Sequence, residues 1–162
     1  MKQQFSFAYT VYDSAEELPA ADKSLLEKAR AATGDAYAPY SRFNVAAAAR
    51  LNDGSLVTAT NQENASYPVG ICAERTLLSA VSALYPGQKI DTIALSYASG
   101  ENTDRPVSPC GLCRQTLVEY EERFSQPIRL VLGGQTGPVY VIPSCADLLP
   151  LRFTAAYLNS KG

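Results

Sequence analysis

Apolar residues follow two different spacings along one uninterrupted chain, and this alternation is the strongest constraint on the fold. Helical spacing occurs at 20–32, 72–85 and 110–124, and short alternating or continuous apolar segments typical of strands occur at 5–11, 45–51, 56–60, 90–97, 128–132 and 139–142. The sequence Asn52-Asp53-Gly54-Ser55 predicts a hairpin between two of these segments, so the first two core strands should be antiparallel. Strands alternating with helices predict an α/β layered domain.

The helix expected at 110–124 carries charges as well as apolar residues. Its inward positions recur at helical intervals, whereas Glu119, Glu121, Glu122 and Arg123 are expected on the outer face. A solvent-facing charged stripe is the usual arrangement for a helix that covers a sheet.

Composition excludes several kinds of partner. The chain has 162 residues, 46% of them hydrophobic and 19% charged, which is typical of one globular domain. The net charge of −2 argues against a nucleic-acid partner, because proteins that neutralise phosphates are normally basic. The sequence has no apolar run of membrane-spanning length and no apolar signal core at its start. We therefore expect a cytoplasmic protein with no membrane partner.

The sequence contains no histidine, which removes most familiar catalytic sites. Ser-His-Asp triads, Cys-His pairs, HExxH metalloproteases and zinc fingers with imidazole ligands are all excluded. Any metal must be held by Cys, Asp or Glu. Any general base must be a carboxylate, Lys, Tyr, Cys or a metal-bound hydroxide.

Three of the four cysteines have a spacing that suits one metal ion. Cys110 and Cys113 lie three positions apart at the start of a predicted helix, and Cys72 begins another. Helix N-termini favour thiolates, and three thiolates around Zn²⁺ leave a fourth tetrahedral position for water. Glu74 is then the natural proton carrier for that water. Arg75 can offset the net negative charge of such a site.

Other interpretations of these residues stay open from the sequence alone. A closed structural zinc site could use Cys145 as its fourth ligand, and a Cys-x-x-Cys pair can also be redox-active. Glu74 could simply be a first-turn acid favoured by the helix dipole. Cys145 is otherwise most simply a small buried residue.

Five motifs follow one another along the chain: Tyr37-Ala38-Pro39-Tyr40-Ser41-Arg42-Phe43, Asn61-Gln62-Glu63-Asn64-Ala65-Ser66-Tyr67, Cys72-Ala73-Glu74-Arg75-Thr76, Pro109-Cys110-Gly111-Leu112-Cys113-Arg114-Gln115, and Leu148-Leu149-Pro150 followed by Phe153. Together, and in this order, they resemble the cytidine deaminases, in the small class with all-cysteine zinc ligands. A Cys-x-x-Cys pair with a nearby glutamate is the general signature of zinc deaminases. The resemblance covers the chain from about Leu25 to Phe153.

The resemblance implies a fold and a reaction. The expected fold is a three-layer α/β/α domain at 25–162 with a mixed five-stranded sheet. Residues 1–24 have no counterpart in the family core and form an N-terminal extension that could add an edge strand or a subunit contact. The expected reaction is hydrolytic deamination of cytidine and 2′-deoxycytidine to the uridines plus ammonia, in pyrimidine salvage. The family also implies one zinc ion per chain and a homotetramer.

Substrate contacts are likewise implied by the resemblance, residue by residue. Asn61 and Glu63 match the pair that holds the ribose hydroxyl, and the backbone N–H of Ala65 matches the one that meets the pyrimidine 2-oxo group. Phe43 matches the aromatic packed against the base, and Phe153 one that reaches a neighbouring subunit's pocket. Two departures stand out: Ala46 replaces the usual glycine, and Leu151-Arg152 precedes Phe153 where smaller residues are usual.

Three competing functions remain for comparison. One is deamination of a modified or antibiotic nucleoside, and another is a non-catalytic binding module stabilised by zinc on four cysteines. A deaminase acting on bases within nucleic acid is disfavoured by the net charge and by the absence of a dense Lys/Arg run.

Overall fold

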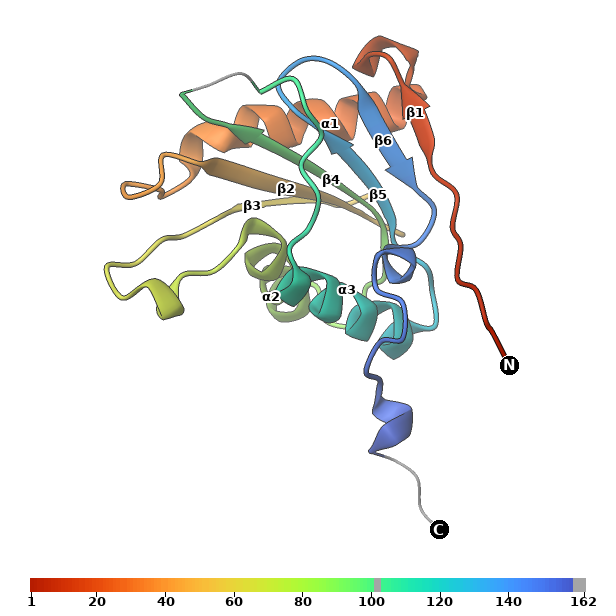
Figure 1. Ribbon diagram of the computed structural model, residues 1–162. Coiled ribbons are helices and arrows are strands. Elements are labelled where there is room, and N and C mark those ends of the chain that lie inside the picture. Colours follow the sequence, from red (N-terminus) through yellow and green to blue (C-terminus); the bar gives the residue numbers. More distant parts are fainter. Residues whose placement is uncertain (101–102, 159–162) are drawn as a thin grey trace.

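The protein is a six-stranded sheet between one helix on one face and two on the other (Figure 1). The computed structural model describes residues 1–100 and 103–158. The strands are β1 (Thr10–Tyr12), β2 (Asn44–Leu51), β3 (Leu56–Thr60), β4 (Ile90–Ala98), β5 (Arg129–Gly133) and β6 (Val139–Ile142). The helices are α1 (Ala20–Ala32), α2 (Ala73–Leu84) and α3 (Gly111–Phe124), with short 3-10 turns η1 (Ala15–Glu17), η2 (Thr33–Asp35), η3 (Tyr67–Val69), η4 (Cys145–Leu148) and η5 (Ala155–Tyr157).

The sheet is mixed, with strand order β1-β6-β5-β4-β2-β3. Strands β4 and β5 are parallel and α3 connects them, whereas the other neighbouring pairs are antiparallel. The β2–β3 hairpin forms as predicted, with Gly54 at φ +88° in its turn. The three-layer α/β/α fold is confirmed. The sheet has six strands rather than five, because the N-terminal extension contributes β1 beside β6.

The first strand is shorter than its sequence pattern predicts. Alternation extends over residues 5–11, but only Thr10–Tyr12 pair with β6. The partner strand ends at Ile142, and Pro143, which follows, has no N–H to donate to a ladder. Residues 1–9 therefore continue as an extended arm beyond the sheet (Figure 1).

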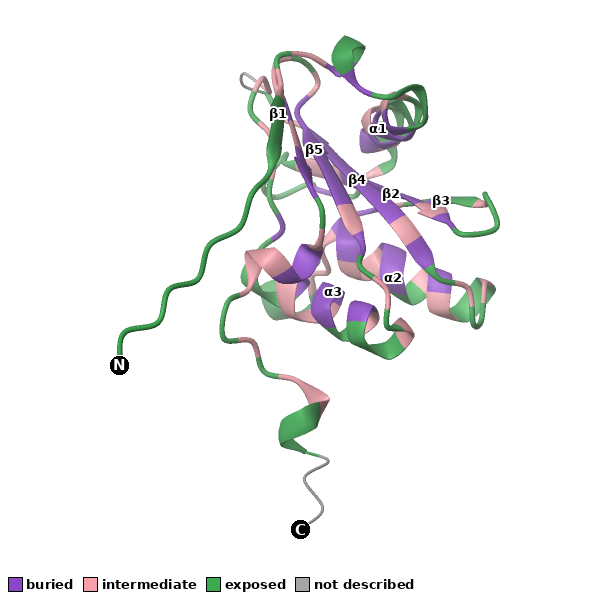
Figure 2. Cartoon of the chain, turned by 90° about the vertical axis from the view of Figure 1, so that its right-hand side faces the viewer, coloured by how far each residue is buried: buried purple, intermediate pink, exposed green. Residues whose placement is uncertain are grey.

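Two apolar cores hold the three layers of the fold together (Figure 2). Leu25, Leu26 and Ala29 of α1 pack on Ala48, Ala94 and Val131 at one face of the sheet. The larger core, on the other face, joins side chains of α2 and α3 to β2, β4 and β5, including Leu77, Leu95, Leu117 and Leu130. No helix in the described ranges is long and apolar enough to cross a membrane.

The prediction that Glu121 faces solvent is wrong. Its side chain is buried and accepts hydrogen bonds from the backbone N–H groups of Ile128 (2.7 Å), Cys145 (3.0 Å) and Ala146 (3.2 Å). The hydroxyl of Ser144 also donates to this carboxylate. These N–H groups lie just before β5 and at the start of η4, where a buried donor needs a partner. Glu121 thereby joins the last turn of α3 to the segment that contains Cys145.

Candidate metal centre and active site

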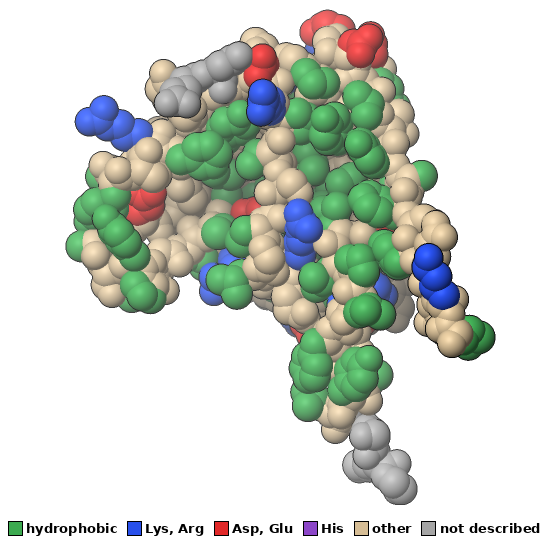
Figure 3. Space-filling view, viewed as in Figure 1, with side chains coloured by type: hydrophobic (Ala, Val, Ile, Leu, Met, Phe, Trp, Pro, Cys, Tyr) green, Lys and Arg blue, Asp and Glu red, His purple; other side chains and the backbone are tan. Residues whose placement is uncertain are grey.

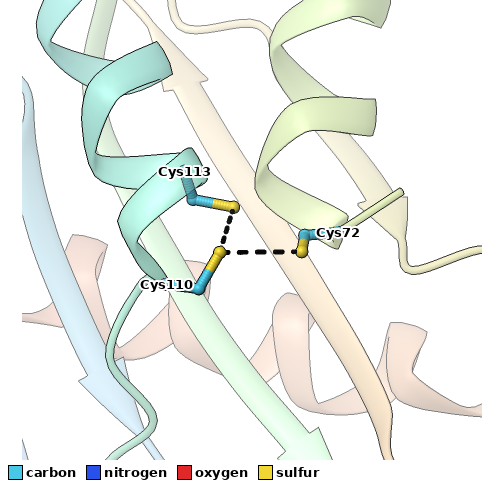
Figure 4. A group of neighbouring side chains, drawn as sticks. All are labelled: Cys72, Cys110 and Cys113. Atoms are coloured by element: carbon cyan, nitrogen blue, oxygen red, sulfur yellow. Dashed lines mark hydrogen bonds between the residues drawn. The ribbon is translucent and has the colours of Figure 1, made fainter. Parts of the chain in front are cut away.

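Three cysteine sulfurs meet where α2 and α3 begin (Figure 4). Cys72 is the residue before the first turn of α2, Cys110 holds the same place at α3, and Cys113 lies in the first turn of α3. The Sγ atoms of Cys72 and Cys110 are 3.9 Å apart, and those of Cys110 and Cys113 are 3.5 Å apart. All three sulfurs lie within 4.8 Å of one another.

This triangle fits a zinc ion. Tetrahedral Zn²⁺ with Zn–S bonds of about 2.3 Å requires sulfur–sulfur separations of about 3.8 Å, close to those observed. Within the described part of the chain the cluster has these three cysteines, and Cys145 does not belong to it. Cys145 is instead fully buried in the apolar core beneath α2 and α3. Three thiols without a fourth protein ligand match an open zinc site rather than a closed structural one.

The surroundings favour a thiolate at this cluster. Hydrogen bonding from the Cys113 thiol, reinforced by Cys110 and by the positive charge of Arg75, lowers the pKa of Cys72 to about 6, against burial and the opposing charge of Glu74. The same hydrogen bond, together with burial, raises the pKa of Cys113. The cluster therefore combines one sulfur that ionises readily, that of Cys72, with one that keeps its proton until a bound cation displaces it, that of Cys113.

Glu74 lies in the first turn of α2, two residues after Cys72. Only 5% of its surface is exposed, so it is not the solvent-facing acid that a helix dipole alone would favour. Burial raises the pKa of its carboxyl group above the usual value. A carboxyl group with a raised pKa is better suited to accept a proton and to release it again than one with the usual, lower pKa.

A cavity of about 300 Å³ opens beside the cluster. It is lined by Ser41, Phe43, Val45, Asn61, Glu63, Cys72, Ala73, Glu74, Val107, Ser108 and Cys110. The volume is at the lower end of the range for small-molecule sites. Five residues singled out in the sequence besides Cys110 therefore share its wall: Phe43, Asn61, Glu63, Cys72 and Glu74.

Phe43, in the cavity wall, belongs to an aromatic pair. Phe43 stacks on Tyr97 with ring centroids 4.9 Å apart and an interplanar angle of 27°. Tyr97, near the end of β4, is buried and was not predicted as a site residue. Its position in an apolar strand segment identified it only as core, since sequence spacing does not show which ring would lie beneath Phe43.

Asn61 and Glu63 hold the segment 40–45 in place. The Asn61 side chain accepts from the backbone N–H of Val45 (2.8 Å) and donates to the carbonyl of Phe43 (3.0 Å). Glu63 accepts from the backbone N–H groups of Tyr40 (2.9 Å) and Ser41 (3.2 Å) and from the Ser41 hydroxyl. The bond from the Ser41 hydroxyl is the main reason that the pKa of Glu63 is below the usual value. Ser41 itself was missed by the sequence reasoning, although it lies inside a quoted motif.

The remaining predicted residues lie outside the cavity wall. Ala65 is exposed in the loop after Glu63, and neither it nor Phe153 belongs to the described residues that line the cavity. Phe153 is 57% exposed, stacks on Tyr157 and accepts at its carbonyl from Gln115 (2.9 Å). Arg75 follows Glu74 in α2, where its charge acts on the Cys72 thiol.

Comparison with known proteins places the site in a family. The family model described as "Cytidine and deoxycytidylate deaminase zinc-binding region" matches residues 19–125, which include all three clustered cysteines and Glu74. The chain belongs to this deaminase family. The predicted membership is thereby confirmed, and with it the zinc dependence of the site.

Individual relatives of the deaminase agree with this assignment. A cytidine deaminase of Halalkalibacterium halodurans is 39% identical over 135 residues, which are 83% of this chain and 96% of that protein. The crystal structure of a cytidine deaminase from Burkholderia pseudomallei has 40% identity and a TM-score of 0.69, covering 84% of this chain and all of that one. A blasticidin-S deaminase of Bacillus cereus is 33% identical over 118 residues, 70% of this chain and 79% of that protein.

Proposed function

We propose that this protein is a zinc-dependent cytidine deaminase that converts cytidine and 2′-deoxycytidine to uridine and 2′-deoxyuridine plus ammonia in pyrimidine salvage. The observation that carries the proposal is a cluster of three thiols beside one small cavity whose wall includes two of them, Cys72 and Cys110, and the buried carboxyl of Glu74. Hydrolysis of an amine from a neutral base needs this combination of an activated water and a proton carrier.

Cys72, Cys110 and Cys113 would hold one zinc ion per chain. When bound, zinc lowers the pKa of water and so supplies a nucleophile at neutral pH. Three thiolates outweigh the charge of a divalent cation. Arg75 and the N-termini of α2 and α3 offset the excess negative charge, and the effect of Arg75 on the pKa of Cys72 supports this role.

Glu74 would carry protons between water and substrate. Its carboxylate accepts a proton from the attacking water and delivers it to ring nitrogen N3, then carries that water's second proton from the new C4 hydroxyl to the leaving amine, so that the C4–N bond breaks as the C4 carbonyl forms. One water and one cytidine thereby give one uridine and one ammonia. Because Glu74 ends each transfer in the state in which it began, a single carboxyl group serves the whole sequence, and its raised pKa suits both directions.

Phe43, Asn61, Glu63 and Ala65 are proposed to bind the nucleoside. Phe43, backed by Tyr97, provides a flat apolar wall for the pyrimidine, and the Ala65 N–H would meet its 2-oxo group. Asn61 and Glu63 would hold the ribose hydroxyl. The Asn61 amide has a second lone pair and a second N–H beyond those that bind segment 40–45, so it can do both.

We also propose a domain division and an assembly. Residues 25–162 would form the catalytic domain, and residues 1–24 an N-terminal extension that contributes β1. A homotetramer would bring Phe153 to the cavity of a neighbouring subunit. Its exposed ring, and the exposed side chains of Tyr67 (74%) and Leu112 (68%), support such an assembly because large apolar side chains in solvent often mark interfaces.

A modified cytosine nucleoside is the second candidate substrate. A further hollow of about 330 Å³, lined by Tyr40 and Tyr67, shares Ser41 and Glu63 with the cavity and offers room for a larger substituent. The blasticidin-S deaminase among the relatives is in keeping with this alternative. Comparing kcat/KM for cytidine with that for base- or sugar-extended analogues decides between the two.

Replacement of Glu74 by glutamine tests the mechanism. The amide keeps the size of the side chain but cannot carry the proton, so E74Q should retain about one zinc per chain and lose about 10²- to 10⁴-fold or more in kcat. The readout is the fall in ultraviolet absorbance as cytidine becomes uridine, with zinc measured on the same sample. Wild-type protein that held zinc but left cytidine unchanged would refute the function, and an active E74Q would refute the role of Glu74.

A further inference from the structure

The N-terminal arm, residues 1–9, carries a ladder of exposed aromatic rings. The ring centroids of Phe5 and Phe7 are 6.5 Å apart, and those of Phe7 and Tyr9 are 6.0 Å apart. Tyr9 then packs on Tyr140 of β6 at 5.2 Å, so the ladder continues onto the sheet. Rings that meet at every second residue lie on one face of an extended strand. Phe5, Phe7 and Tyr9 are nevertheless 52%, 43% and 48% exposed.

The backbone of this segment also lacks a full partner strand. Its strand-like pattern covers residues 5–11, whereas its pairing with β6 in the described chain covers only Thr10–Tyr12. Because β1 is the edge of the sheet, its outer side is open as well. Hydrophobic side chains gather where β1 and β6 lie in this view of the surface (Figure 3). A long apolar strand at an open edge is a template for pairing with another chain.

We propose that the N-terminal arm pairs antiparallel with the same arm of a second copy of this chain, about a twofold axis at Phe7. Phe7 then lies opposite the partner's Phe7, and Phe5 lies opposite the partner's Tyr9. All the rings of both arms fall on one face, forming cross-strand aromatic pairs. A shift by one residue would place the rings of the two copies on opposite faces, and a shift by two would leave two cross-strand ring pairs instead of three, so the ring pattern favours this register.

The charges of the segment favour a second copy over an unrelated partner. Between residues 1 and 12 the only charged side chain is Lys2, and acidic side chains follow at Asp13, Glu16 and Glu17. Antiparallel pairing about Phe7 places Lys2 opposite the partner's Tyr12, next to the partner's Asp13. The positive end of each arm thus meets the acidic end of the other, twice in one symmetric contact.

The structure also offers space for the partner's rings. Phe5 and Phe7 stand over a hollow of about 580 Å³ whose other walls include Arg114, Leu148 and Pro150. Three half-exposed rings can bury roughly 300 Å² per copy, since a full aromatic side chain buries about 150–250 Å². That is below the roughly 800 Å² per partner of a standard interface, so the arms would reinforce an assembly that has other contacts.

Engineered disulfides test both the contact and its register. F7C should form an intermolecular disulfide in oxidised glutathione, because facing residues of antiparallel strands lie about 4.5–5.5 Å apart at Cα. F5C alone should not form this disulfide, because residue 5 of one copy lies opposite residue 9 of the other and the two introduced thiols would be four positions apart. The double variant F5C/Y9C places cysteines opposite each other and should cross-link. Wild-type, zinc-loaded protein under the same conditions controls for the native thiols. Absence of an F7C disulfide, or equal cross-linking of F7C and F5C, would overturn the proposal.

A second measurement asks whether the rings stabilise the contact. In the F7C background, F5S/Y9S removes the flanking aromatics and should slow disulfide formation about tenfold. The arm does not line the catalytic cavity, so zinc content and cytidine turnover should be unchanged and serve as controls for folding. An unaltered cross-linking rate would refute the aromatic ladder as the cause of pairing.

Discussion

Identical cysteine side chains have two different environments in this protein. Cys72, Cys110 and Cys113 lie at helix starts beside a cavity, with one of them exposed and one half-buried. Cys145 lies in the apolar core, where burial, reinforced by the nearby Glu121 carboxylate, raises the pKa of its thiol. Position on the fold, rather than residue type, therefore decides which sulfur can become a metal ligand.

Replacing Cys145 by alanine should leave the metal in place. C145A removes one buried sulfur at a cost of about 1 kcal/mol in unfolding free energy, and the bound zinc should remain at about one per chain. C113A is the matched comparison and should lose the metal. Zinc analysis after gel filtration gives the answer: loss of zinc from C145A would mean that the centre is a closed four-cysteine site and the protein a binding module.

Glu63 gives a pH-dependent prediction. Its pKa lies below the usual value of 4.5. The charged carboxylate therefore stabilises segment 40–41 fully at a pH above 4.5, and this stabilisation is lost as the pH falls through the lowered pKa. S41A removes the largest cause, so the pKa of Glu63 should move up toward its usual value. Carbon-13 NMR titration of the Glu63 carboxyl measures this. S55A, in the distant β2–β3 hairpin, should change nothing, and an unmoved pKa in S41A would contradict the assigned cause.

At the level of elements, the strap at 103–110 depends on the turn between β5 and β6. Gln135 donates its backbone N–H to the carbonyl of Thr103 (2.9 Å), and that carbonyl passes directly over Gly134. A Cβ on Gly134 would lie 1.8 Å from the Thr103 oxygen, and one on Gly137 would lie 2.3 Å from the Asp104 oxygen. The glycines of this turn therefore allow the strap that leads to Cys110 to pack closely.

G134A should accordingly displace the strap. We expect a loss of about 1–3 kcal/mol in unfolding free energy, typical of overpacking, and faster zinc release. G100A is the control, because a Cβ there meets nothing within 4 Å and no left-handed backbone is required. Denaturant titration and the rate of zinc transfer to a chromogenic chelator report the two effects. If G134A matched G100A in both, the strap would not depend on this turn.

The sequence predicted most elements but not the contacts between them. The helices and core strands lie within one or two residues of their expected ranges because their apolar periodicity reflects burial on the two faces of a sheet. Residues 5–9 and Glu121 were predicted wrongly for one shared reason. Pairing and burial there depend on Pro143, Ile128 and η4, which are distant in sequence, and no local pattern reports them.

Motifs and residue spacing predicted part of the site. The cysteine triad and the neighbouring acid follow from spacing at two helix starts, and the geometry brings those three sulfurs together. The hydrogen bonds from Ser41 to Glu63 and the stacking of Tyr97 on Phe43 join segments on different strands and loops. Such contacts are set by tertiary packing, which one sequence does not show.

For the whole molecule, zinc should act as a structural link between α2 and α3. Metal that binds only the folded state stabilises it by about 4 kcal/mol at a free concentration a thousandfold above Kd. Chelation should therefore lower the melting temperature, and calorimetry with and without chelator measures the shift. E74Q, which keeps the ligands, should show the same shift as wild type. A melting temperature indifferent to chelator would mean that the cluster holds no metal.

The order of the segments along the chain has a consequence for biosynthesis. The three clustered thiols leave the ribosome before the glycine turn at 133–137, on which the strap before Cys110 packs. The strap that positions Cys110 therefore cannot pack until translation has added that turn, and until then the thiols of the nascent chain lack this part of their final surroundings. We expect this enzyme to depend on a reducing environment most strongly while it is being made.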